Sequence, residues 1–150
     1  MLGKDITLIT TFQLADWSKA WSPSMLFRFS PTVDSLSLIQ FLVLTSIIIA
    51  LCLALNSSIE KRRVVIYCLM PAVGCLVAGW IATYLSHRAA VAVVLFSNIP
   101  VPLDMLSEVS TYQVVPLILG VLGMIVNLII GTVTLICRPA PIGEEITSDG

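Results

Sequence analysis

The stretch VVPLILGVLGMIVNLIIGTVTLIC (residues 114–137) contains no Asp, Glu, Lys, Arg or His, and its length and composition decide the fold of this chain. Two further runs share this property: LSLIQFLVLTSIIIALCLAL (residues 36–55) and VVIYCLMPAVGCLVAGWIATYL (residues 64–85). A hydrocarbon core about 30 Å thick is crossed by roughly 20 helical residues. The sequence therefore predicts an all-α membrane protein with three transmembrane helices, at about 36–55, 64–85 and 114–137.

The composition of the whole chain agrees with a membrane location. Of its 150 residues, 57% are hydrophobic and 11% are charged, and the mean hydropathy is +1.00. Soluble domains carry about 25% charged residues, and a globule of this size has too little interior to bury so much apolar surface. A formal net charge of −1 provides no basic field for nucleic acid. The lipid bilayer is the first expected partner, and nucleic acid is not expected.

The chain divides into a transmembrane helical domain, residues 36–137, and two tails. The N-terminal tail, residues 1–35, contains apolar residues followed by Trp17 and Trp21. This pattern favours a short amphipathic helix at the membrane interface with the tryptophans as anchors, because an indole ring is apolar while its N–H stays hydrated. The C-terminal tail, residues 138–150, is short and acidic.

The stretch 89–103 is apolar but too short to cross the bilayer as a straight helix. Three interpretations stay open: it lies flat at the interface, it enters the bilayer and returns, or it extends the second helix. His87 and Arg88 precede it and are predicted to be interfacial anchors, with the imidazole hydrated. Asp104 and Glu108, which follow it, are assigned to the connecting loop.

A cluster of cations, Lys61, Arg62 and Arg63, lies in the short connection between the first two predicted helices. Cytoplasmic loops retain Lys and Arg, so the cluster places this loop and the C-terminus in the cytoplasm and the N-terminus outside. The eight cations of the chain divide equally between the two sides, and the density of the cluster decides the assignment. The expected location is a bacterial inner membrane or an equivalent membrane.

The third predicted helix carries small and polar residues at steps of three or four, which places them on one face. They are Gly120, Gly123, Asn127 and Gly131, and Pro116 and Thr134 continue the row. Small residues let a neighbouring backbone approach closely, and an amide can hydrogen-bond across the contact. The face is therefore predicted to be a helix–helix interface, within the chain or between copies. The second helix carries a weaker version at Gly74 and Ala78.

The chain lacks the residue patterns of catalytic and metal sites. It has no G-x-S-x-G, no Walker loop and no H-E-x-x-H, and its four cysteines lack the paired spacing of a zinc site. No ionisable Asp, Glu, Lys, Arg or His lies within a predicted span, which argues against ion-coupled transport. The sequence predicts no enzyme activity, no cofactor, no metal and no small-molecule substrate.

These features favour a structural or accessory subunit of a larger membrane complex, whose partners are other membrane subunits or copies of itself. Two alternatives stay open. With three spans and an external N-terminus the chain resembles phage holins in topology, which implies a self-assembling pore former. It departs from them in its acidic end, GEEITSDG (residues 143–150), where holins usually end in a basic tail. The other alternative is a small membrane immunity or exclusion factor that blocks an incoming toxin or partner.

Overall fold

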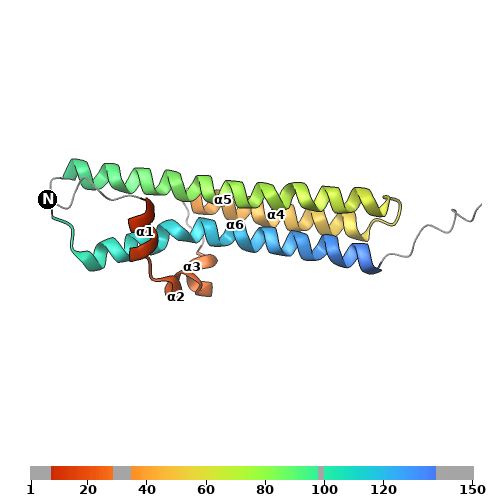
Figure 1. Ribbon diagram of the computed structural model, residues 1–150, viewed down its shortest axis with the longest axis horizontal. Coiled ribbons are helices and arrows are strands. Elements are labelled where there is room, and N and C mark those ends of the chain that lie inside the picture. The colour runs from red at the N-terminus through yellow and green to blue at the C-terminus, as the bar shows by residue number, and fades with distance from the viewer. Residues whose placement is uncertain (1–7, 29–34, 98–99, 138–150) are drawn as a thin grey trace, which may run out of the picture.

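Three long and three short helices make up most of the part of the chain that the computed structural model describes, residues 8–28, 35–97 and 100–137 (Figure 1). No strand occurs among these residues. The predicted acidic tail, residues 138–150, lies outside them. The helices are α1 (Leu8–Leu14), α2 (Trp17–Ala20), α3 (Pro23–Leu26), α4 (Ser35–Leu55), α5 (Lys61–Ser97) and α6 (Leu103–Cys137).

The helices α4, α5 and α6 are long and apolar enough to cross a membrane. Each contains one of the three uncharged runs. In hydrocarbon every backbone N–H and C=O needs an internal partner, which a helix provides. Pro71 and Pro116 lie inside α5 and α6 without ending them. The prediction of an all-α protein with three candidate spans is confirmed.

The helices α5 and α6 are longer than the bilayer is thick. They have 37 and 35 residues, or about 55 Å and 52 Å at 1.5 Å per residue. The 21 residues of α4 correspond to about 32 Å, close to the thickness of the hydrocarbon core. Of the three long helices that the structure describes, α4 is the one whose length matches the thickness of the hydrocarbon core.

The stretch 89–103 follows the third of its interpretations, because its residues up to Ser97 continue α5 as regular helix. No glycine or proline interrupts this part of the sequence before Pro100. The assignment of Asp104 and Glu108 to a loop is corrected: both lie in the first two turns of α6, which begins directly after the second proline of the connection.

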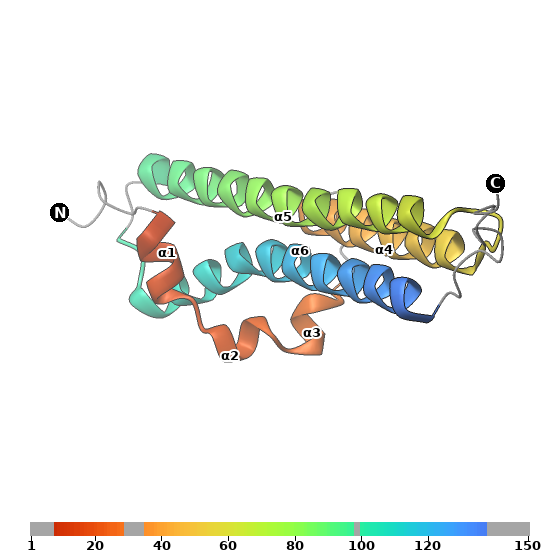
Figure 2. The same ribbon diagram turned by 45° about the vertical axis from the view of Figure 1, so that its right-hand side comes forward.

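The helices α5 and α6 lie side by side, and α4 covers only one half of this pair (Figures 1 and 2). At the start of α4, Leu38 shares a groove with Leu85 of α5, and Leu36 packs against the apolar cluster that contains Val115 of α6. Two segments therefore extend past the beginning of α4. We call them the overhang: residues 86–97 of α5 and 103–113 of α6.

The N-terminal segment, residues 8–28, folds back onto α6 as three short helices (Figure 2). Asp16 caps α2, since its carboxylate accepts hydrogen bonds from the backbone N–H groups of Ser18 and Lys19 at 3.1 and 3.3 Å. Pro23 occupies the first turn of α3, where its missing N–H removes no helical bond. The region where an amphipathic helix was predicted thus holds helices of seven, four and four residues.

Candidate functional site

The small-residue face of α6 is packed against α4 and α5 of the same chain. At Gly120, a Cβ would lie 2.5 Å from the carbonyl oxygen of Cys75 and 3.0 Å from the Cα of Gly79. At Gly79, a Cβ would lie 2.7 Å from the carbonyl oxygen of Pro116. Neither position has room for a side chain, so the two backbones touch, as small residues permit.

Two further glycines of this face also make room for neighbouring helices. At Gly123, a Cβ would lie 3.0 Å from both methyl groups of Val43 in α4 and 3.2 Å from the Cβ of Cys75 in α5. At Gly131, it would lie 3.2 Å from the Cβ of Cys68. Both glycines therefore serve contacts within the chain.

Asn127 is fully buried and joins the three long helices. Its Nδ2 donates to Ser46 Oγ in α4 at 3.0 Å and to the carbonyl of Gly123 at 2.8 Å. The Ser46 hydroxyl donates its one proton to the carbonyl of Val43 at 2.8 Å. The thiol of Cys75 in α5, 3.3 Å from Ser46 Oγ, is then the donor of that pair. We call Asn127, Ser46 and Cys75, with the carbonyl groups of Gly123 and Val43, the amide junction.

Ala78 and Gly74, the two small residues predicted to form an interface on the second span, lie in different surroundings. Ala78 packs partly buried against the core. Gly74 is exposed, and a Cβ there would meet no atom within 4 Å. Gly74 takes no part in the contact with α6, because the face that meets α6 runs through Cys75 and Gly79, and successive helical residues point about 100° apart. It lines an open groove between α5 and α4 instead.

Two hydroxyl groups of the overhang, one helical turn apart, hold the N-terminal segment. Ser107 Oγ donates to the carbonyl of Leu14 at 2.9 Å. Thr111 Oγ1 accepts from the backbone N–H of Asp16 at 2.9 Å and donates to the carbonyl of Ser107 at 2.7 Å. Leu14 and Asp16 flank the turn between α1 and α2, so this turn is fixed to α6.

The carboxylate of Asp16 completes the same turn. The hydroxyl of Ser18 donates to it at 2.6 Å, and the backbone N–H of Lys19 adds a second hydrogen bond. These bonds hold the pKa of the Asp16 carboxyl below its ordinary value of 3.8. The carboxylate therefore stays ionised in its capping role through the neutral and mildly acidic range.

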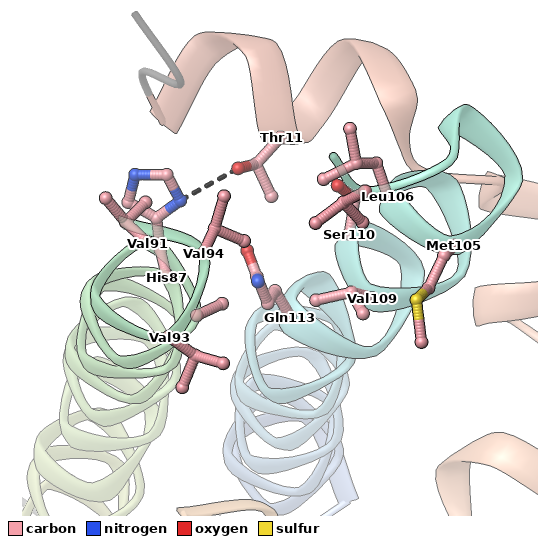
Figure 3. A pocket seen from close by; sticks show the side chains of 12 residues that line it. Thr11, His87, Val91, Val93, Val94, Met105, Leu106, Val109, Ser110 and Gln113 are labelled. Carbon is pink, nitrogen blue, oxygen red and sulfur yellow. Dashed lines mark hydrogen bonds between the residues drawn. The ribbon is translucent and has the colours of Figure 1, made fainter. Parts of the chain in front are cut away.

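His87 lies beneath α1 and is only 7% exposed. Its Nδ1 is 2.8 Å from Thr11 Oγ1 of α1, and one of the two groups donates to the other (Figure 3). The prediction of a hydrated histidine at the interface is corrected. The imidazole is covered because the N-terminal segment returns across the overhang and presents a hydroxyl to it.

A cavity of about 270 Å³ lies next to this pair, between α1, α5 and α6. Its lining is mostly apolar, and its polar members are Thr11, His87, Ser110 and Gln113 (Figure 3). Gln113 is 7% exposed, and its Oε1 has no hydrogen-bond partner. The cavity lining thus includes a buried amide whose oxygen has no partner.

The other predicted anchors lie on the surface. Trp17 is 40% exposed and Trp21 is 48% exposed, and Arg88 is also exposed. The Trp17 indole donates to the carbonyl of Phe12 at 3.1 Å and stacks on its ring, with centroids 6.0 Å apart. Phe12 also stacks on Trp80 of α5 at 6.2 Å, which attaches α1 to the helix pair.

The cationic cluster lies at the end of the bundle opposite the overhang (Figure 1). Lys61 is the first residue of α5, so the cluster forms the first turn of that helix, and the connection itself is residues 56–60. Arg62 and Arg63 are exposed. Arg63 Nε lies 3.5 Å from Glu60 Oε2 in a solvent-accessible ion pair, which contributes little to stability.

Sequence reasoning missed residues that join the N-terminal segment to the overhang or line the cavity between them. They lie in stretches interpreted as a tail and a loop, where isolated hydroxyl and amide groups carry no periodic signal. The spacing of four between Ser107 and Thr111 would have placed both on one helical face once the early start of α6 was known. The missed residues are Thr11, Ser107, Ser110, Thr111 and Gln113.

Among the described residues, no group of three or more His, Cys, Asp or Glu side chains is placed to hold a metal ion. No family model, no curated protein and no solved structure matches the chain. The candidate functional site is therefore defined by geometry: an overhang covered by a tethered N-terminal segment, with a partly polar cavity between them.

Proposed function

We propose that this chain is a structural, non-catalytic subunit of a larger membrane complex, and that it contacts its partner through the overhang. The observation that carries the proposal is the projection of apolar helices past α4. Because α4 is about as long as the hydrocarbon core of about 30 Å is thick, the overhang lies beyond that core when α4 crosses it.

Large apolar side chains remain exposed on the overhang and on α1 above it. The exposed fractions are 68% for Ile9, 69% for Val93, 68% for Leu103 and 58% for Met105. Apolar surface is stabilised by about 25 cal/mol for each Å² removed from water, and in this arrangement the hydrocarbon core ends where the overhang begins. Exposed apolar surface outside the bilayer is typical of protein interaction sites. A neighbouring subunit is therefore the partner expected to bury these side chains.

The small-residue face of α6 is already occupied. Gly120, Gly123 and Asn127 are buried against α4 and α5. A partner therefore has to use another surface, which supports the overhang as the contact and disfavours assembly of copies through the third-span face.

Site-specific photo-crosslinking in native membranes tests this proposal. A benzophenone amino acid replaces Ile9 or Leu103, and matched controls carry it at Leu44 or Ile129, which are 58% and 55% exposed on α4 and on the membrane-spanning part of α6. The probes at Ile9 and Leu103 are expected to give an adduct of discrete mass, and the controls are expected to give none. Absence of such an adduct from both Ile9 and Leu103 would contradict the proposal.

The pore-forming alternative makes the opposite prediction in a reconstituted system. A structural subunit purified alone causes no dye leakage from sealed vesicles and stays small in mild detergent. Leakage that accompanies large homo-oligomers would replace the subunit proposal with a pore former.

We further propose that the overhang lies outside the cytoplasm, as the cationic cluster at the opposite end favours. The test is Ser58→Cys, in the exposed α4–α5 connection, on a Cys137→Ser background. In right-side-out vesicles an impermeant maleimide is expected to label this cysteine only after permeabilisation. Labelling of intact vesicles would reverse the orientation.

A further inference from the structure

The cavity under α1 has the features of a binding site for a small molecule. Three elements enclose it: Thr11 comes from α1, His87 and Val94 from α5, and Ser110 and Gln113 from α6 (Figure 3). Its volume of about 270 Å³ is near the lower end of the roughly 300–1,000 Å³ typical of ligand pockets. We propose that the cavity binds a small, neutral, largely apolar molecule that carries a hydroxyl group, in the simplest case an aliphatic alcohol.

Gln113 is the observation that favours a polar group on the ligand. Its side chain is more than nine-tenths buried, extends from α6 toward α5 (Figure 3), and leaves Oε1 without a partner. Buried polar groups without partners are rare and unfavourable. A ligand hydroxyl both donates and accepts, so it can pair with either end of the amide.

The remaining lining explains why the ligand is neutral and otherwise apolar. No Lys, Arg, Asp or Glu occurs among the described lining residues, so a carboxylate or an ammonium group would be desolvated without a counter-charge. The walls between the polar positions are formed by aliphatic side chains, among them Val91, Leu106 and Val109. These walls suit a short hydrocarbon chain.

The position of the cavity allows two sources for this chemistry. The overhang borders the membrane, so the hydroxyl can belong to a free alcohol or to a lipid such as diacylglycerol, in which a hydroxyl lies beside hydrocarbon. The inference does not depend on the proposed function, because the cavity is formed within one chain and is tested on the purified protein.

The test is photolabelling of the full chain in phospholipid nanodiscs with an octanol that carries a diazirine. Mass spectrometry is expected to map saturable adducts to cavity residues such as Val94 and Met105. Octanol is expected to compete, whereas octane, which lacks the hydroxyl, competes at least about fivefold more weakly, the factor of one hydrogen bond. A second set of discs containing diacylglycerol distinguishes the sources: reduced labelling there identifies the lipid hydroxyl, and unchanged labelling identifies the free alcohol.

Two variants and a control make the outcome decisive. Gln113→Leu keeps the volume and removes the amide, and is expected to weaken labelling about fivefold. Ala90→Phe fills the cavity from α5 and is expected to abolish the saturable adducts. Thr132→Val, on the exposed side of α6, is expected to label like the natural chain. Non-saturable labelling, equal competition by octane, or unchanged labelling of both cavity variants would overturn the proposal.

Discussion

Gly79 and Gly120 bring the backbones of α5 and α6 into direct contact, since a Cβ on either glycine would lie 3.0 Å from the Cα of the other. The amide of Asn127 lies on the same face of α6, about two turns further on. Because the contact at Gly79 is backbone against backbone, no rotamer change can make room for a side chain. The separation of the two longest helices is therefore set at this point.

Gly120→Ala is expected to destabilise the chain by about 1–3 kcal/mol, the usual effect of overpacking, because its Cβ would meet the carbonyl oxygen of Cys75 at 2.5 Å. The matched control is Gly74→Ala on α5, which has free space and is expected to gain about 0.5–1 kcal/mol from helix propensity. Unfolding by SDS in mild detergent, followed by circular dichroism, measures both. Equal stability of the two variants would contradict the close contact.

The amide junction predicts an energetic coupling between α4 and α6. Asn127 donates to Ser46 at 3.0 Å, and interhelical hydrogen bonds in membrane proteins contribute about 0.6 kcal/mol on average and up to about 1.7. A double-mutant cycle with Asn127→Leu and Ser46→Ala is expected to return a coupling in this range. Thr132→Val, paired with Ser46→Ala, serves as the uncoupled control. Additive effects of the first pair would show that the junction does not join the helices.

Ser107→Ala and Thr111→Val are expected to loosen the N-terminal segment without unfolding the long helices. Each removes a hydrogen bond to the turn between α1 and α2, worth about 1 kcal/mol. Hydrogen exchange in residues 8–16 is then expected to accelerate about fivefold for each variant, while exchange in α4 stays unchanged. Exchange rates like those of the natural chain would mean that other contacts hold this segment.

The cap at Asp16 predicts a response to acid. The pKa of its carboxyl is lowered when the chain is folded, chiefly by the hydrogen bond from the Ser18 side chain. A lowered pKa means that the stabilisation is present above the unfolded value of about 4 and is lost as the pH falls through the folded value. The amide signals of Ser18 and Lys19 are expected to titrate with a midpoint below 3.8, and Asp16→Asn is expected to remove this titration. A midpoint at or above 3.8 in the natural chain would contradict the cap.

The overhang marks where sequence-based prediction of the fold stopped. The uncharged runs identify the three long helices, but they do not identify the additional turns of α5 and α6. Whether the helix continues from His87 to Ser97 depends on local helix propensity and on contacts with neighbouring segments. Asp104 and Glu108 are charged, as loop residues often are, but both lie in α6. Hydropathy measures how compatible a segment is with lipid. The part of a helix that extends beyond the lipid therefore has no hydropathy signal by which it can be predicted.

The sequence by itself determined the all-α class and the three helices that can cross a membrane, and it predicted close packing along the face of α6 that carries Asn127. Hydrocarbon forces every backbone group to bond within its own helix, and small residues pack closely wherever they meet a neighbour. Only the tertiary structure decided which neighbour that is, because Gly79 contacts Gly120 while Gly74 borders an open groove beside α4. The tertiary structure also decided that Thr11 is hydrogen-bonded to His87, 76 residues further along the sequence. A single long-range hydrogen bond leaves no periodic pattern in the sequence, so it could not be predicted.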